Sequence, residues 1–478
     1  MGLFTKKLRG LTKFAYDATE KARRRRNRPR DLRSEDNVLR QSQRSQIISD
    51  TRDLRRNFTL AAWLIRVHLD HVAVANFQSQ NGLDSLDERI EQLMVEWQRP
   101  KNCDVAGRHD FASMIRMAEQ GRTVDGDIAV MKLSNGKLQL IEGDRIRQPD
   151  SVGDFTTYKK DDFVHGVQLN GALEAKRYAI CDRDPNGGYT LRSVIPAQYI
   201  HLFGYFDRPD QVRGISPLVS SLNQANDLYA ANEYTLEKMK IASMIGLKIE
   251  RPDDGGEDED DEECAEGEEA PKPPAHKFDF NGPQVLNMLP GEKVDFVESK
   301  TPAVEFQQYL VTTIQNFMKS LDIPYSFAAE NFTNYSGHRG ALLTYRNSCM
   351  LKRVRLKQLL HDITIWRLTL WILDGDLVLP DGMTVYDLKF DWVGGSIPWI
   401  DPLKEVQANA LLVEKNMACL EDLCRERGVD FYAMADKRKR EIDYLNKLGI
   451  PVGSTPIVIP LEKPEEEEEG SDGSRQAA

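Results

Sequence analysis

The spacing of apolar residues changes twice along this 478-residue chain, and this change constrains the fold more than any other feature. From Asp53 to Gln120 apolar residues recur every three or four positions, which indicates amphipathic helices. Between Asp127 and Phe206 the period falls to two, which indicates short strands. From Pro217 onward the helical period returns. This order predicts an α+β fold, in which strands and helices occupy separate stretches of the chain.

The first helical region divides into three predicted helices. They cover Asp53–Val74, Asp84–Trp97 with Asp84 as its N-cap, and Arg108–Gln120. Each has apolar residues at three- and four-residue spacings, so each is expected to bury one face.

The β-rich region is expected to consist of hairpins. Its clearest strands are Ile128–Leu133, Leu138–Ile141 and Tyr199–Phe203. Asn135-Gly136 separates the first two and is typical of a type I′ turn. A second turn is predicted at Asn186-Gly187-Gly188.

The rest of the chain predicts long helices interrupted by turns and insertions. Ile323-Pro324 ends one of these helices, because a residue before proline is disfavoured in helical conformation. The predicted segments are the helices Pro217–Leu247 and Val304–Leu321, a polar loop Asn331–Gly340, a very long helix Ala341–Leu373, a β-like segment Thr384–Val393 and a helical stretch Pro402–Leu448.

Charge is segregated along the chain. The first 60 residues hold 17 Lys and Arg against 7 Asp and Glu, an excess of ten positive charges in a chain whose net charge is −11. Residues 1–50 lack apolar periodicity and are interpreted as a flexible basic arm. Two roles remain open for the arm, contact with phosphates or docking on an acidic protein surface. Its cations include Arg23, Arg24, Arg25, Arg26, Arg28 and Arg30.

The remaining residues therefore carry a net charge of about −21. The acid is concentrated in Asp253–Glu269 and in the tail at Glu465–Glu469. Runs of like charge repel themselves, so both are expected to be solvated insertions rather than packed structure.

No sequence motif indicates an enzyme. The phosphate-binding G-x-x-x-x-G-K-[ST] loop and the H-E-x-x-H zinc motif are absent, and Gly394-Gly395-Ser396-Ile397-Pro398 fails the nucleophile-elbow pattern. His68 and His71 lie three residues apart but lack a third ligand at a suggestive spacing. We therefore expect no catalytic residues, no metal and no cofactor. The six scattered cysteines are expected to be reduced thiols, and no apolar run is long enough to span a membrane.

Seven segments in order resemble the lambda-type portal proteins of tailed bacteriophages. The most specific is Asp207–Pro217, which reads DRPDQVRGISP. The others are Arg52–Asn57 with Ala61-Ala62-Trp63, Ile141–Ile146, Ile195-Pro196-Ala197 with Ile200–Phe203, Ile323-Pro324-Tyr325, Asn331–Ser336 with Arg339, and Trp399–Pro402 with Lys404-Glu405. The resemblance runs from about Arg52 to Gly449; the long acidic run Asp253–Glu269 departs from it.

The resemblance implies a ring of about twelve subunits around a central channel, each with a wing, stem, clip and crown. Carried over in order, the wing would be residues 51–216 and the two stem helices 217–247 and 302–322, with a clip at 248–301 between them. Residues 323–400 would hold a channel loop, a long wing helix and a β segment, residues 401–450 the crown, and residues 451–478 a disordered acidic tail.

The same resemblance implies the function. A portal ring would occupy one capsid vertex, conduct double-stranded DNA during packaging and ejection without reading its sequence, and nucleate prohead assembly. Its implied partners are the terminase large subunit, scaffold and major capsid protein, and head–tail connector proteins. It would be found in the virion, and in the host cytoplasm during assembly.

The loop Asn331–Gly340 would reach the channel, where Asn334, Tyr335, His338 and Arg339 could touch the DNA backbone. The alternative for these four residues is a contact with the neighbouring subunit. For the whole chain there are two alternatives. One is a metal-dependent hydrolase without a recognisable motif, whose activity would be lost on chelation. The other is a packaging accessory that binds DNA through the Arg-rich arm. That protein would bind DNA tightly as a monomer or dimer, whereas a conduit must let the duplex slide.

Overall fold

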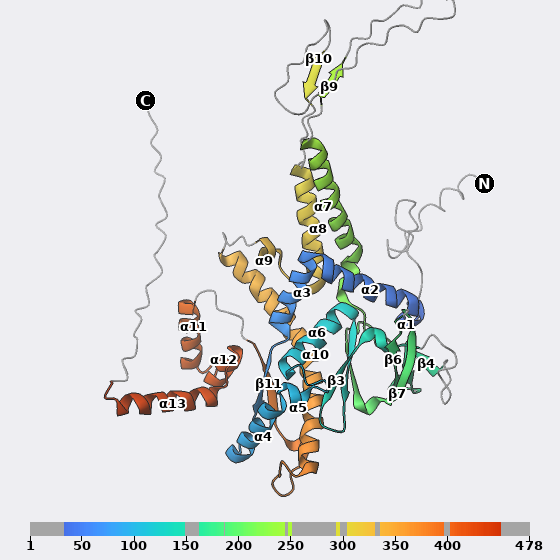
Figure 1. Ribbon diagram of the computed structural model, residues 1–478. Coiled ribbons are helices and arrows are strands. Elements are labelled where there is room, and N and C mark those ends of the chain that lie inside the picture. The colour runs from blue at the N-terminus through green and yellow to red at the C-terminus, as the bar shows by residue number, and fades with distance from the viewer. Residues whose placement is uncertain are drawn as a thin grey trace, which may run out of the picture. The chain divides into compact units, whose positions relative to one another are not determined.

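The computed structural model describes residues 33–148, 162–185, 187–243, 247–250, 293–296, 304–329, 335–395 and 402–450. The chain divides into two compact units, residues 1–392 and 393–478. Helices and strands alternate in blocks, so the predicted α+β class is confirmed (Figure 1).

The described part of the first unit begins with helices α1 (Glu35–Val38), α2 (Gln41–Asn57) and α3 (Thr59–Val72). The prediction of an arm over residues 1–50 is therefore wrong from Glu35 onward. α2 is anchored by Arg44 and Ile48, which are both buried. The pattern missed this helix because much of its buried face is polar.

α2 and α3 also correct the predicted single helix Asp53–Val74. Phe58 between them is extended, with φ −111° and ψ 107°. Its ring packs against Tyr229 and Phe317, with centroids 6.0 and 6.1 Å apart. Side-chain packing therefore breaks a helix that periodicity alone predicts as continuous.

The next helices are α4 (Asp84–Trp97), α5 (Pro100–Cys103) and α6 (Phe111–Asp125). The bounds of α4 are confirmed, but Asp84 is its first residue rather than its N-cap. Asp87 in the first turn instead holds the segment before the helix, since its carboxylate accepts hydrogen bonds from the backbone N–H groups of Asn81, Gly82 and Leu83. α6 begins after Asp110, which caps it through the N–H of Ser113.

Two antiparallel sheets form the β-rich region. The first has the order β3–β2–β8, from Leu138–Glu142, Asp127–Lys132 and Ile200–Gly204. The second has the order β4–β5–β6–β7, from Phe163–Val164, Val167–Leu169, Ala175–Arg183 and Tyr189–Pro196. The hairpin turn predicted around Gly187 joins β6 to β7, and Gly187 has φ 87°.

The turn between β2 and β3 differs from the predicted type I′. In this turn the backbone N–H of Gly136 donates a hydrogen bond to the backbone oxygen of Leu133 at 3.0 Å, and Gly136 has φ 75°. Asn135 does not share the positive φ that a type I′ turn requires of both central residues. The hairpin is thus a tight turn that ends in a left-handed glycine.

α7 (Leu222–Ser243) and α8 (Val304–Met318) run side by side, with the antiparallel strands β9 (Leu247–Glu250) and β10 (Lys293–Phe296) beyond them (Figure 1). The predicted helix Pro217–Leu247 is shorter than expected, because Pro217–Ser221 form a 3₁₀ turn and Leu247 begins β9. The second predicted helix is confirmed, with a 3₁₀ turn at Lys319–Leu321. The acidic run Asp253–Glu269 lies outside the described residues.

After the short helix α9 (Tyr325–Ala329), α10 spans Tyr335–Asp374 and so begins earlier than the predicted Ala341. The loop prediction is therefore wrong for Tyr335–Gly340. Glycine costs a helix about 1 kcal/mol relative to alanine, but α10 offsets this by burying residues along its later turns. These include Tyr345, Leu356, Leu359, Leu360 and Ile363.

The core of the first unit gathers apolar side chains from α3, α4, α6, α8 and α10 and from β2 and β3. β1 (Ala75–Ser79) pairs with β11 (Phe390–Gly394), which confirms part of the predicted segment Thr384–Val393. The second unit comprises α11 (Pro402–Glu414), α12 (Leu420–Glu426) and α13 (Phe431–Lys447), where a helical stretch was predicted. Within the described residues, no helix is both long and apolar enough to cross a membrane.

Candidate functional site

Arg213 and Asp127 form a buried ion pair at the junction of α6, β2 and the segment before α7. Arg213 donates from Nε and Nη2 to the two oxygens of Asp127, each at 2.7 Å, and both side chains are almost fully buried. The remaining Arg213 donors reach the backbone oxygens of Gly143, Ile146 and His165. One guanidinium therefore ties together three segments that are distant in sequence.

The charge of Asp127 is stabilised by a second cation. Burial alone would raise the pKa of Asp127, but the charges of Arg213 and Arg44 outweigh burial and hold that pKa below its usual value. Burial, and then the neighbouring Arg213, lowers the pKa of Arg44 to about 10. The N–H of Gly214 also donates to Asp127, at 2.8 Å.

A second ion network lies beside the first. Arg52 on α2 donates to Asp125 at 2.8 Å and to Asp144 at 2.8 Å. Arg183 on β6 donates to both oxygens of Asp144, at 2.8 and 2.7 Å. Hydrogen bonds from Arg183 and Tyr189 and the charge of Arg52 hold the pKa of Asp144 well below its usual value, against the effect of burial. The network thus links α2 to both sheets.

Two glycines allow these segments to approach one another. A Cβ on Gly214 would lie 2.2 Å from Gly126 O, and one on Gly143 would lie 2.5 Å from Asp127 O. Real Cβ atoms do not tolerate such distances from backbone, so only glycine fits at either position.

Within the described ranges, no group of three or more His, Cys, Asp or Glu could hold a metal ion. His68 Nε2 lies 2.8 Å from Glu119 Oε1, whereas His71 Nδ1 lies 2.8 Å from the backbone oxygen of Val67. The two histidines thus have separate partners, and the ion networks serve to join structural elements.

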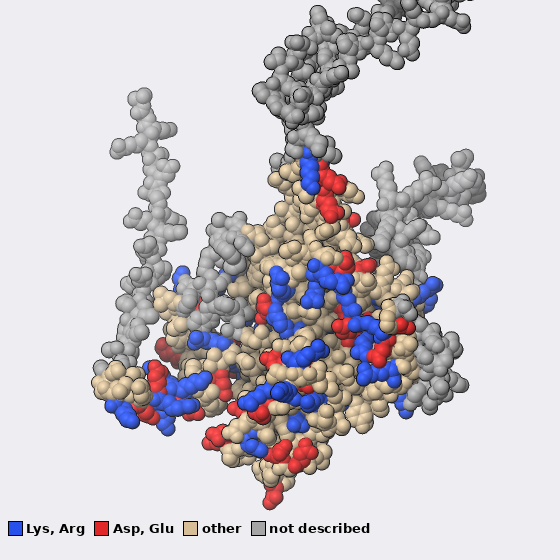
Figure 2. Space-filling model, viewed as in Figure 1, with Lys and Arg blue, Asp and Glu red and all other residues tan. Residues whose placement is uncertain are grey.

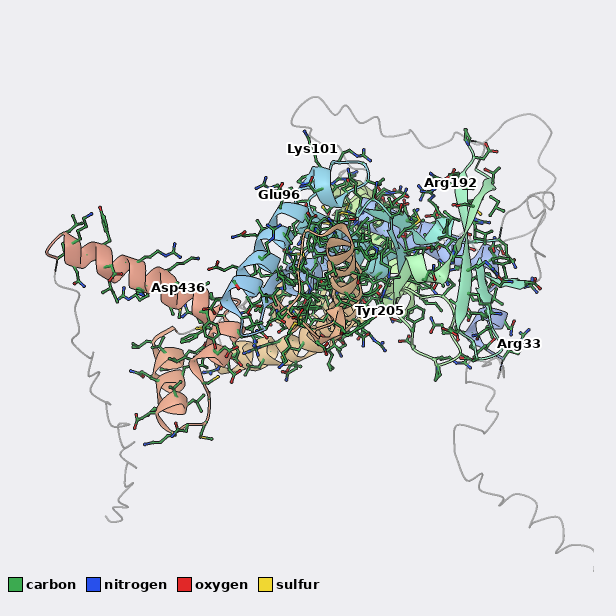
Figure 3. All side chains as sticks on the ribbon, turned by 90° about the horizontal axis from the view of Figure 1, so that it is seen from below. Arg33, Glu96, Lys101, Arg192, Tyr205 and Asp436 are labelled. Carbon is green, nitrogen blue, oxygen red and sulfur yellow. The ribbon has the colours of Figure 1, made fainter. Side chains whose placement is uncertain are left out.

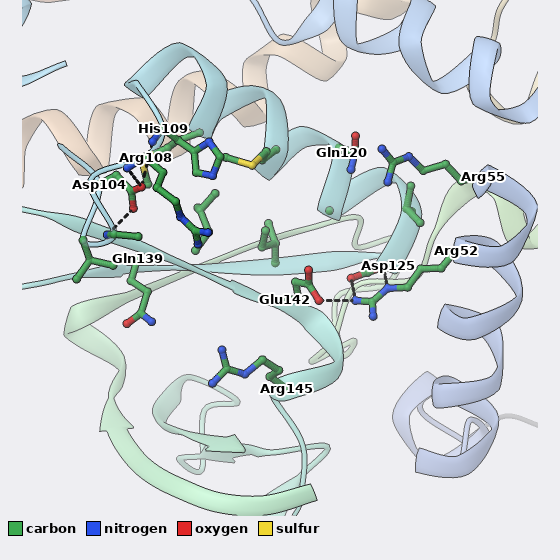
Figure 4. A pocket seen from close by; sticks show the side chains of 18 of the residues that line it. Arg52, Arg55, Asp104, Arg108, His109, Gln120, Asp125, Gln139, Glu142 and Arg145 are labelled. Carbon is green, nitrogen blue, oxygen red and sulfur yellow. Dashed lines mark hydrogen bonds and ion pairs between the residues drawn. The ribbon is translucent and has the colours of Figure 1, made fainter. Parts of the chain in front are cut away.

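A pocket of about 700 Å³ opens beside the second network (Figure 4). Its walls come from α2, α6, β3 and the turn that follows α5. Arg55 and Arg108 line it from opposite sides, and the Arg52–Asp125 pair closes one end (Figure 4). Figure 2 shows Lys and Arg side chains gathered over α2 and α6 on this face of the molecule.

The predicted channel residues are not part of this pocket. Asn334 lies outside the described residues, as does the whole predicted basic arm Arg23–Arg30. Tyr335 and His338 belong to the first turns of α10, and Arg339 is exposed there. Three of the four predicted residues therefore share one helix end.

The residues of the ion networks were not predicted as a site. The family resemblance could have pointed to some of them, since Arg52, Asp144 and Arg213 each lie in a segment that carries it. Their partners Asp125, Asp127 and Arg183 lie outside those segments, and only the folded chain brings them together. The pocket residue Arg108 lies in no motif and in no segment that carries the resemblance.

The chain is similar in sequence to a known protein family and to three known proteins. Residues 21–353 match the family described as "Phage portal protein, lambda family". The portal protein of Escherichia phage N15 is 21% identical over 480 residues, covering 89% of each chain. Portal protein B of Escherichia phage lambda is 21% identical over 81% of this chain and 82% of that protein. The probable portal protein of Halomonas phage phiHAP-1 is 23% identical over 77% of this chain and 72% of that protein.

Solved structures similar to this chain come from gene transfer agent particles. A chain in the neck of an empty particle, computed with C6 symmetry, has a TM-score of 0.49 and 12% identity, covering 80% of this chain and 94% of that one. A chain in the native virion has a TM-score of 0.46 and 11% identity, covering 80% of this chain and 93% of that one.

Proposed function

Because the chain belongs to the lambda family of phage portal proteins, we propose that about twelve copies form a ring at one capsid vertex. The ring is the conduit through which double-stranded DNA enters and leaves the capsid. In this arrangement the protein is a component of the virion, assembled in the host cytoplasm.

The observation that carries the ring proposal is the exposed surface of α7. Past Leu228, none of the described side chains of α7 is buried. Tyr234 and Leu236 are 70% and 53% exposed, and Tyr309 on α8 is 56% exposed. Isolated helices are only marginally stable in water, and helices in proteins gain most of their stability from packing an apolar face. Two paired helices with so many exposed apolar side chains are therefore expected to pack against the same helices of neighbouring subunits.

Changing Tyr234 and Leu236 together to Asp tests this packing. The double variant should remain monomeric, because each charge would be buried between subunits without a partner. Glu233→Gln, at an exposed position of the same helix, is the matched control and should assemble like the wild type. The measurement is the mass of the assembly by mass photometry, with circular dichroism to confirm folding. Normal assembly of the folded double variant would exclude α7 from the interface.

We further propose that the start of α10 faces the channel. Arg339 is exposed there, and Tyr335 and His338 lie in the same turns. A few exposed donors can touch phosphates without reading sequence, while the acidic balance of the chain beyond its arm limits how tightly DNA is held. Twelve copies would repeat each weak contact around the ring.

Changing His338 and Arg339 together to Ala should leave the ring intact and shorten the DNA packaged or retained per particle. Arg355→Ala, an exposed arginine farther along α10, is the control and should package full-length DNA. The measurement is genome length per purified particle. Full-length DNA in the double variant would assign these side chains to contacts between subunits instead.

The remaining roles follow from the order of segments. α7 and α8 would form the stem, and the segment between them, including β9 and β10, the clip. The clip would dock the terminase large subunit during packaging and head–tail connector proteins afterwards. The helices α11 to α13 would form the crown. The basic residues before Glu35 would contact scaffold or major capsid protein and so help to nucleate the prohead.

A further inference from the structure

Three arginines that line the pocket beside the ion networks have no side-chain partner among the described residues. Arg55 and Arg56 on α2 and Arg108 after α5 make no hydrogen bond or ion pair through their side chains within the described part of the chain. The other three lining arginines are all engaged. Arg52 and Arg183 bind carboxylates of the second network, and Arg145 pairs with Asp182.

The pocket has a positive excess that its own acids do not neutralise. Six arginines and three carboxylates line it. Asp125 and Glu142 are paired with Arg52. Asp104 accepts hydrogen bonds from the backbone N–H groups of Ala106, Arg108 and His109 at 3.0, 2.9 and 3.1 Å. No lining carboxylate is therefore left for the three unpaired arginines.

Apolar side chains form part of the lining, beside the polar His109, Gln120 and Gln139. Met114, Met117 and Val124 come from α6, and Ile128, Leu140 and Val105 come from neighbouring segments. Methionine side chains adapt to irregular partners. The pocket thus combines an adaptable apolar floor with free guanidinium groups.

This combination discriminates between classes of ligand. The lining residues include no Phe, Tyr or Trp on which a nucleobase could stack. The sugar-phosphate backbone of DNA would leave the apolar floor uncovered. A peptide with both acidic and apolar side chains satisfies both parts, because guanidinium groups bind carboxylates with paired hydrogen bonds. The volume of about 700 Å³ lies in the range of pockets that enclose a small ligand or a few residues.

We propose that this pocket binds an acidic peptide segment of a partner protein. Carboxylates of the segment pair with Arg55, Arg56 and Arg108, and an apolar side chain of the segment covers the methionine floor. The proposal goes beyond the role as a DNA conduit and does not depend on it.

The test measures the affinity of the full-length protein for a fluorescent peptide, Glu-Glu-Leu-Glu-Glu. The wild type should bind this peptide, and binding should weaken when Gln replaces Glu or Ser replaces Leu. Changing Arg55, Arg56 and Arg108 together to Ala should weaken binding about tenfold or more, since several ion pairs are lost at once. The matched control changes Arg66, Arg192 and Arg355 to Ala, which removes the same charge elsewhere and should leave the affinity unchanged.

Three outcomes would overturn the proposal. Equal losses in the two triple variants would mean non-specific attraction to a basic surface. A loss of binding to a short DNA duplex in the pocket variant, without any peptide binding by the wild type, would assign the pocket to nucleic acid. Failure of the wild type to bind the peptide would leave the arginines as solvated residues near a helix end. Mass photometry of the same samples reports ring formation separately, so failure of the peptide site and failure of the ring are distinguishable.

Discussion

At the scale of single residues, Arg213 has the largest expected effect on stability. Changing Arg213 to Met should lower the free energy of unfolding by about 3–5 kcal/mol, because Asp127 would remain charged, buried and partly unpaired. Arg192→Met is the matched control. Arg192 lies on the four-stranded sheet (Figure 3), and its side chain is 53% exposed, so its loss should cost less than about 0.5 kcal/mol. Denaturant unfolding measures both values, and similar values would contradict the structural role of Arg213.

Gly214 tests the close approach of backbone segments in the same cluster. Gly214→Ala should destabilise the protein by roughly 1–3 kcal/mol or more, because the new Cβ would overlap Gly126 O. Gly171→Ala is the control, since a Cβ there meets no atom within 4 Å. The control should be neutral or slightly stabilising. Thermal unfolding of the two variants compares them, and equal melting temperatures would refute the close packing at Gly214.

His68 predicts a dependence of stability on pH. Burial lowers the pKa of His68 despite the nearby Glu119, whose Oε1 also accepts a bond from Arg122 at 2.7 Å. A protonated ring would also place its Nδ1–H where the described residues offer no acceptor. Arg122 and Lys352 further disfavour the imidazolium. The folded protein therefore holds His68 neutral, while the unfolded chain protonates it near pH 6.5.

The difference in the pKa of His68 between the folded and unfolded protein sets the direction in which stability changes with pH. The unfolded chain binds more protons below pH 6.5, so stability should be complete above that pH and fall as the pH decreases. His68→Gln keeps a donor to Glu119 and should reduce the slope of unfolding free energy between pH 7 and 5. Unfolding titrations at several pH values measure the slope. An unchanged slope in the variant would show that His68 is not responsible.

At the scale of elements, the start of α10 is the clearest correction to the sequence-based expectation. Because it contains Gly337 and Gly340, the segment Asn331–Gly340 was predicted to be a loop, although Tyr335–Gly340 are helical. Gly340→Ala should therefore slow hydrogen exchange over the first turns of α10, because alanine stabilises a helix by about 0.5–1 kcal/mol relative to glycine. A Cβ at this position meets no atom within 4 Å. Mass spectrometry measures the exchange, and unchanged exchange would support a loop.

Elements with a regular apolar period were predicted well from the sequence. The bounds of α4 and the start of α8 are as expected, because apolar spacing and flanking turn residues are local signals. The break at Phe58 was not predicted, since it depends on contacts with Tyr229 and Phe317 far along the chain. The ion networks were missed for the same reason. Arg213 and Asp127 are 86 residues apart, and no local pattern pairs them.

For the whole molecule, the proposed function requires assembly into a ring. The family and the exposed face of α7 support a ring, and the charge distribution suits a conduit. Ten excess positive charges precede residue 61, while the chain as a whole carries −11. A protein that holds DNA tightly would need its cations along the DNA path, with binding that weakens steeply as salt rises.

Electron microscopy of the purified full-length protein shows directly whether its subunits form a ring. Class averages should show rings of about twelve subunits with a central hole wide enough for a DNA duplex. DNA binding by the same sample should be weak at physiological salt. A population of monomers or dimers that binds DNA tightly, and loses that binding when residues 1–33 are deleted, would contradict the portal ring and support a packaging accessory that acts through its basic arm.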